Sequence, residues 1–185
     1  VPEGGGRLLK QDARLTANLH LTPREDGGSS KIKIGLHFAP EGTELVESIN
    51  HWTINNTFVI PPGEANHFVS AEWTAPYDAT VFGLIPHMHY RGKDMQFTAV
   101  YPDGRDELLL DSIWSKDWQL TYNPVEPYQV TKGTKIRVTG HFDNSTENEF
   151  NPDPAKEVRW GLTVKDEMFI GYIDYMPTLE NESSD

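Results

Sequence analysis

Residues 80–90 read TVFGLIPHMHY, an apolar run rich in β-branched and aromatic residues that ends in two histidines. This composition favours an extended strand. Residues two positions apart on a strand point to the same face, so His87 and His89 present two imidazoles side by side on a stiff support. Pro86 has no N–H group to donate, which indicates a strand end or a sheet edge at this point. The stretch therefore predicts both a β fold and a candidate metal site.

Similar short runs recur along the chain, and its 15 Gly and 13 Pro separate them at short intervals. Period-two alternation of apolar and polar residues is typical of strands that are buried on one face. The predicted strands are residues 14–21, 31–38, 53–60, 67–74, 80–90, 94–101, 107–113, 118–122, 134–142 and 167–175. About ten short strands joined by turns predict an all-β fold, an antiparallel β-sandwich or jelly roll.

We expect one domain over residues 1–185, because no linker or internal repeat interrupts the pattern. Its ordered core is expected from about Gly5 to Pro177, followed by an acidic tail over residues 178–185. Pro61–Gly63 and Pro102–Gly104 predict tight turns, in which Pro fixes φ and Gly supplies a positive φ.

Charge and composition exclude several classes of function. Asp and Glu number 28 against 16 Lys and Arg, so the net charge is −12 and a polyanion such as nucleic acid is repelled. The chain has no Cys, which excludes disulfides, thiolate metal sites and cysteine nucleophiles. It also has no apolar run of about 18 residues, so no membrane span is expected.

The His87/His89 pair has the spacing of metal ligands on a strand. A thioether as third ligand, from Met168, selects a soft metal, and copper is the natural candidate. The alternative is that one histidine lies on the surface and the other is hydrogen-bonded in the core, with Met168 as core filler. Possible secondary metal ligands are His20 and His141, each at the end of a predicted strand. His37, His51 and His67 show no pairing in sequence and are interpreted as structural or surface residues.

Other chemistries have weaker support in the sequence. It contains no Gly-x-Ser-x-Gly, no phosphate-binding glycine loop and no His-Glu-x-x-His. The carboxylate pairs Asp106/Glu107 and Asp166/Glu167 are expected to be solvated. Trp114 and Trp118 could stack on a sugar, as in aromatic-rich sandwiches. Asn-x-Ser/Thr triplets begin at Asn55, Asn144 and Asn181, which leaves glycosylation open.

Several motifs together resemble a known family. They are, in order, IPPGE at 60–64, PHMHYRGK at 86–93, WQLTY at 118–122, FDNS at 142–145, NPDP at 151–154, Trp160-Gly161 and DEM at 166–168. The chain resembles the C-terminal domain of the copper type II, ascorbate-dependent monooxygenases, which include peptidylglycine α-hydroxylating monooxygenase and dopamine β-monooxygenase. The motifs resemble those of bacterial members of that domain family.

The resemblance implies a jelly roll in which His87, His89 and Met168 ligate one copper, the site of oxygen binding. It implies ascorbate or another reductant as partner, and a location outside the cytoplasm, periplasmic or secreted. Two cysteines of the animal enzymes correspond to Phe169 and His141, which predicts that these two residues are neighbours.

The family enzymes also carry a second copper on a preceding domain. Residues 18–23, NLHLTP, resemble the segment that supplies the last histidine of that second site. The adjacent histidine pair that completes it is absent from this sequence, so His20 is at most an orphan ligand.

Three functions follow as hypotheses. The first is the oxygen-binding half of a copper monooxygenase, which hydroxylates C–H bonds only when a second copper domain is supplied. The second is a copper-binding or assembly module without turnover. The third is a metal-free sandwich that binds carbohydrate or protein.

Overall fold

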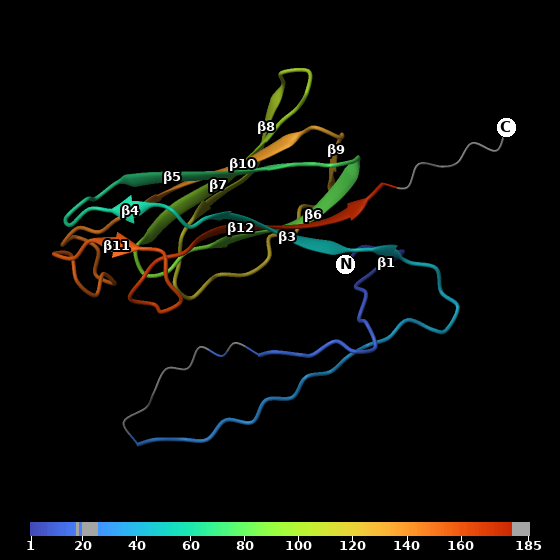
Figure 1. The fold of residues 1–185 in the computed structure, drawn as a ribbon, viewed down its shortest axis with the longest axis horizontal. Coiled ribbons are helices and arrows are strands. Elements are labelled where there is room, and N and C mark those ends of the chain that lie inside the picture. The colour runs from blue at the N-terminus through green and yellow to red at the C-terminus, as the bar shows by residue number, and fades with distance from the viewer. Residues whose placement is uncertain (18, 20–25, 179–185) are drawn as a thin grey trace.

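Two four-stranded antiparallel sheets pack face to face in the computed structural model, which describes residues 1–17, 19 and 26–178 (Figure 1). One sheet has the strand order β5-β10-β7-β8 and the other β3-β12-β6-β9, while β1 pairs with β2 and β4 with β11. The strands are β1 Gly5–Gly6, β2 Val46–Glu47, β3 Ile49–Asn55, β4 Val59–Ile60, β5 His67–Thr74, β6 Ala79–His87, β7 Gly92–Val100, β8 Asp106–Ile113, β9 Tyr128–Val130, β10 Lys135–Phe142, β11 Val158–Arg159 and β12 Phe169–Pro177. The predicted all-β antiparallel sandwich is confirmed.

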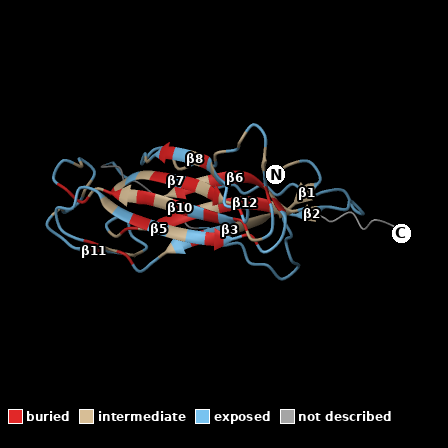
Figure 2. Cartoon of the chain, turned by 90° about the horizontal axis from the view of Figure 1, so that it is seen from above, coloured by how far each residue is buried: buried red, intermediate tan, exposed pale blue. Residues whose placement is uncertain are grey.

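The core lies between the two sheets, because alternate residues of their strands point inward. On β10, Ile136, Val138, Gly140 and Phe142 are buried, whereas the residues that alternate with them are exposed or half-buried. Figure 2 shows this alternation of buried and exposed positions along the strands. The sheets approach closely at Gly171 of β12, where an added Cβ would lie 2.7 Å from Val138 and 2.8 Å from Phe97.

Most predicted strands are found, with shifted ends. Residues 67–74 form β5 as predicted, and the runs at 80–90, 94–101, 107–113, 134–142 and 167–175 correspond to β6, β7, β8, β10 and β12. Residues 118–122 do not form a strand; only Tyr122 makes an isolated bridge, to Leu84. The predicted turns are confirmed, since Gly63 and Gly104 have φ of 70° and 87°.

The N-terminal strand predictions are wrong. Residues 31–38 and the described part of 14–21 have no strand partner. The described residues between β1 and β2, 7–17, 19 and 26–45, instead belong to a long excursion, here called the arm, which leaves the sandwich beside β1 and returns at β2 (Figure 1). Every described residue of the arm is exposed. Alternation is necessary for a half-buried strand but not sufficient, because a ladder also needs a neighbouring backbone.

Within the described ranges, no helix is long and apolar enough to span a bilayer. The prediction that one domain spans residues 1–185 stays a prediction.

Candidate metal centre

The candidate ligands meet where β6 ends and β12 begins. His87, the last residue of β6, pairs with Ile170 of β12 in an antiparallel register. This pair is the last of the β6–β12 ladder, and the segments that carry His89 and Met168 lie directly beyond it. Met88 and Phe169 are both fully buried in the core. The two segments stay together beyond the ladder, since the His89 amide donates to Glu167 at 2.8 Å and Nδ1 of His89 lies 3.1 Å from the carbonyl oxygen of Asp166. His89 is buried, whereas His87 and Met168 are half-buried.

The two histidine rings are close and nearly perpendicular. Their centroids are 5.4 Å apart and their planes make an angle of 89°. Two imidazoles that bind one ion through nitrogens at about 2 Å, at a tetrahedral angle, have centroids about 5 Å apart. The observed pair thus fits a shared metal ion.

His89 is held by the backbone of the segment that precedes Met168. Its side chain is buried, and Nδ1 lies 3.1 Å from the carbonyl oxygen of Asp166. Because a carbonyl only accepts hydrogen bonds, Nδ1 carries the proton in this contact and Nε2 has the lone pair. A neutral imidazole oriented in this way is the form that binds metals. His87 is half-buried and its ring lies 6.1 Å from that of Tyr172.

Glu167 lies beneath the two ligand segments and is fully buried, so the prediction that the Asp166/Glu167 pair is solvated is wrong for Glu167. Its Oε2 accepts a hydrogen bond from the His89 amide at 2.8 Å, and its Oε1 accepts one from the Arg91 amide at 2.6 Å. Burial raises the pKa of Glu167, and the hydrogen bonds from the Arg91 and His89 amides and the charge of Arg91 oppose that shift and favour the carboxylate.

The Arg91 side chain is buried beside this carboxylate. Nη1 lies 3.8 Å from Oε1 of Glu167 and donates to the carbonyl oxygen of Lys165 at 3.0 Å. Nε donates to Oδ1 of Asn144 at 2.9 Å. Burial lowers the pKa of Arg91, and the charge of Glu167 opposes that shift. The sequence analysis missed both Arg91 and Glu167, although each lies within two residues of a candidate ligand.

Asn144 extends this network into the polar loop after β10. Its side chain is fully buried, and Nδ2 donates to the carbonyl oxygens of Pro61 at 2.8 Å and Lys156 at 2.9 Å. The loop that ends at Pro154 is therefore fixed to the base of the candidate site.

Of the two candidate secondary ligands, only His141 is among the described residues, and it lies away from this site. His141 belongs to β10, in the other sheet, where Nδ1 lies 2.8 Å from Oδ1 of Asp94 and the ring contacts Phe68. Phe169 packs in the core against Phe142, the residue that follows His141, so its predicted proximity to His141 stays a prediction. His20 lies outside the described residues.

The other histidines lie elsewhere. His37 is exposed on the arm, His67 begins β5, and His51 of β3 stacks on Trp73 at 5.1 Å. Burial lowers the pKa of His51. Across the described part of the chain, no three His, Cys, Asp or Glu residues cluster as metal ligands. The His87–His89–Met168 set contains only two residues of these types, so this finding does not test it.

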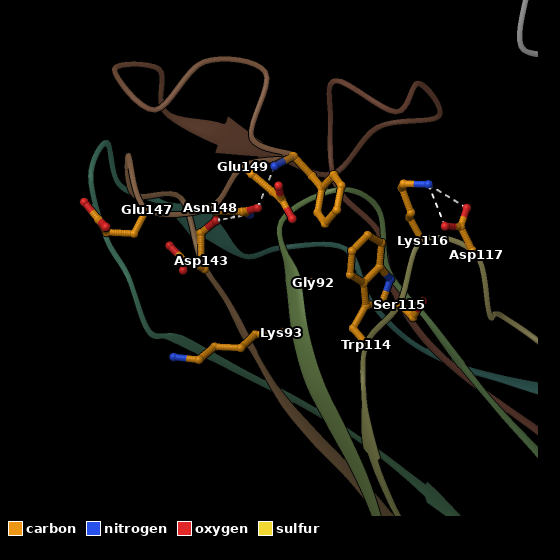
Figure 3. A pocket seen from close by; sticks show the side chains of 11 residues that line it. Gly92, Lys93, Trp114, Ser115, Lys116, Asp117, Asp143, Glu147, Asn148 and Glu149 are labelled. Carbon is orange, nitrogen blue, oxygen red and sulfur yellow. Dashed lines mark hydrogen bonds and ion pairs between the residues drawn. The ribbon is translucent and has the colours of Figure 1, made fainter.

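A recess of about 380 Å³ adjoins the segment that carries the histidines. Its walls include Trp114, Phe150 and Glu149, and Figure 3 shows acidic side chains on one side of it and the Trp114 indole on the other. Trp114 Nε1 donates to the carbonyl oxygen of Met88 at 3.2 Å, and its ring contacts Phe150 at 6.4 Å. Trp114 thus supports the histidine segment, whereas Trp118 is 56% exposed.

Aromatic side chains continue from His87 across the outer face of the β3-β12-β6 sheet. Tyr172 packs edge-on against Trp52 at 5.2 Å, and Trp52 and Ile54 are exposed. Burial raises the pKa of Tyr172. An apolar, aromatic surface of this kind beside a candidate metal site is typical of an interface or a ligand site.

The comparison with family models identifies the same family that the sequence motifs resemble. The model of the copper type II ascorbate-dependent monooxygenase C-terminal domain matches residues 52–184, well over half of the chain. No curated protein matches the chain. The match begins in β3 and takes in β6 and β12, and therefore His87, His89 and Met168. The chain belongs to the copper type II ascorbate-dependent monooxygenase family, as its C-terminal domain.

Proposed function

We propose that this chain is the copper-binding half of a monooxygenase and that it holds one copper through His87, His89 and Met168. The observation that supports the proposal is the pairing of His87 with Ile170, together with the contact between His89 Nδ1 and the Asp166 carbonyl oxygen, which bring the histidine segment next to the segment that carries Met168. Two neutral imidazoles and a thioether suit Cu(I). Bound copper would supply the one-electron redox chemistry that this family uses for C–H hydroxylation.

The chain's own residues would orient the ligands and shield the site. The carbonyl oxygen of Asp166 fixes the proton on Nδ1 of His89, which directs Nε2 to the metal. Met88 and Phe169 close the core side of the site, so a substrate approaches from the opposite face, over Tyr172 and Trp52.

Metal analysis after reconstitution tests the ligand set. We expect about one copper per chain, lost in His87→Ala and His89→Ala. Met168→Leu should weaken Cu(I) binding more than Cu(II) binding, because it removes only the soft ligand. His141→Ala is the matched control and should keep full copper. Full copper in the His87/His89 double variant would overturn the assignment.

We further propose that the partner is an N-terminal copper domain, which the family's two-domain organisation implies, and that it contacts the arm. Ile32, Ile34, Leu36 and Phe38 alternate along the arm and are 51–67% exposed. Burying them against another β domain would supply the missing ladder partner. Limited proteolysis should cut the arm in this chain and spare it when a family N-terminal domain is fused before Val1; equal cleavage would contradict the contact.

Without that partner the chain should not couple oxygen to hydroxylation. One copper stores one electron, whereas hydroxylation needs two, so ascorbate oxidation should release mainly hydrogen peroxide. Product and oxygen consumption are measured with a glycine-extended peptide and with a phenethylamine, and near one-to-one coupling would overturn this expectation. A periplasmic or secreted location is part of the proposal, and cell fractionation tests it.

A further inference from the structure

The buried Glu167–Arg91 pair links two segments that are far apart in the sequence. The hydrogen bond from the His89 amide to Glu167 spans 78 residues, and that from the Arg91 amide spans 76. Glu167 also immediately precedes Met168. A single carboxylate therefore holds the backbone of one proposed ligand, His89, next to the backbone of another, Met168.

Arg91 links the same two segments through its backbone amide and its guanidinium. Its backbone amide donates to Glu167, while its guanidinium donates to the carbonyl oxygen of Lys165, two residues before Glu167. Its carbonyl oxygen accepts a hydrogen bond from the Asp143 amide at 2.7 Å, and Asn144 accepts one from Nε. The histidine segment, the methionine segment and the polar loop thus converge on one ion pair, in which the side-chain exposures are 1% for Arg91 and 0% for Glu167.

Such a pair is costly to bury, so its presence needs a reason. Taking two charges out of water is unfavourable unless close contacts satisfy them, and an apolar pair of similar volume often stabilises a fold as well or better. An apolar pair accepts no hydrogen bonds from backbone amides, so it cannot fix the position of a neighbouring backbone segment. Here both carboxylate oxygens accept amides from the segment that carries the histidines.

We propose that Glu167 and Arg91 are positioning residues that fix the distance between the histidine and methionine ligands before copper binds. They touch backbone and not the metal, and act by preorganising the ligand set. This inference rests on the proposed function, because it presupposes that His87, His89 and Met168 bind the metal.

The experiment compares Glu167→Gln and Arg91→Lys with the wild-type chain. Cu(I) affinity is measured by competition with a chromophoric Cu(I) chelator, and the Cu(II) form is examined by electron paramagnetic resonance. We expect Glu167→Gln to weaken Cu(I) binding at least about tenfold and to change the Cu(II) spectrum. Arg91→Lys keeps the backbone amide and the charge but loses the Nε contact, and should show a smaller loss.

A matched control lies on β12, the strand that follows Glu167 and Met168. Asp174 of β12 is also a buried carboxylate and accepts hydrogen bonds from Arg7 at 2.8 Å and Asn50 at 2.9 Å. Asp174→Asn should lower the melting temperature but leave the copper affinity and the Cu(II) spectrum unchanged. If Asp174→Asn lost as much copper affinity as Glu167→Gln, the loss in both variants would come from lower stability of the fold, and the inference would be overturned.

If Glu167→Gln folds poorly, amide hydrogen exchange in the copper-free chain tests the inference instead. In the copper-free chain, the amides of His89 and Arg91 should exchange with solvent faster in Arg91→Lys than in the wild type. Unchanged exchange together with unchanged copper affinity in Arg91→Lys would overturn the inference while leaving the copper site standing. A wild-type chain that binds no Cu(I) would instead overturn the proposed function itself.

Discussion

Gly171→Ala should destabilise the sandwich, because the two sheets approach closely at Gly171. An added Cβ would lie 2.7 Å and 3.0 Å from the two methyl carbons of Val138, and 2.8 Å from the ring of Phe97. Both neighbours are fully buried, so neither can move aside without disturbing the core. Overpacking of this kind costs about 1–3 kcal/mol. The loss of unfolded-state entropy in a Gly-to-Ala change returns about 0.4–1 kcal/mol.

The net expectation is a loss of about 1–2 kcal/mol in the free energy of unfolding. For a chain of this length, that corresponds to a fall in Tm of roughly 2–8 °C. Urea titration and thermal melts measure both quantities. The matched control is Gly35→Ala on the arm, where an added Cβ has nothing within 4 Å, and Tm should stay unchanged.

A double-mutant cycle identifies the cause of the loss. Val138→Ala removes both methyl groups that the new Cβ would meet, so Gly171→Ala should cost less in that background than in the wild type. Additive effects of the two substitutions, or a Gly171→Ala variant as stable as the wild type, would refute the proposed clash.

Two further predictions concern the sheet and the recess. His51 has its pKa lowered by burial, so between that pKa and about 6.5 the unfolded chain binds more protons than the folded one. Stability therefore rises with pH through this window, and His51→Phe should lose less stability than the wild type between about pH 7.5 and pH 5; equal urea-measured losses would contradict this. Trp114→Phe removes the hydrogen bond to the Met88 carbonyl and should cost about 1 kcal/mol in chemical denaturation. A Trp114→Phe variant of wild-type stability would show that this hydrogen bond makes no net contribution.

Local patterns predicted the fold and the histidine pair well. A period of two is a property of a single strand, so β5, β6 and the shared face of His87 and His89 follow from neighbouring residues alone. Their ring distance of 5.4 Å agrees with that prediction. Pro86 was correctly interpreted, because β9 pairs with β6 only at residues 79–81 and leaves the later part of that edge without it.

Contacts between distant residues were not predictable in the same way. The residues alone left Met168 as either a third ligand or core filler, and the family resemblance favoured the ligand. Nothing in the chemistry of Asp166-Glu167 shows which carboxylate is buried, since that depends on backbone amides 76 and 78 residues away. In the arm, a local pattern was present but the distant contact was not. Its sequence alternates like that of a strand, yet its described residues have no ladder partner.

The burial of Asn144 bears on how this protein can be produced. The triplet Asn144-Ser145-Thr146 is an acceptor for N-linked glycans, yet the amide nitrogen to which a glycan would attach already donates to Pro61 and Lys156. In a host that glycosylates chains during translocation, modification and folding compete for the same nitrogen. A glycan added first would keep Asn144 out of the interior and separate it from Arg91, so the choice of expression host affects the yield of correctly folded chain.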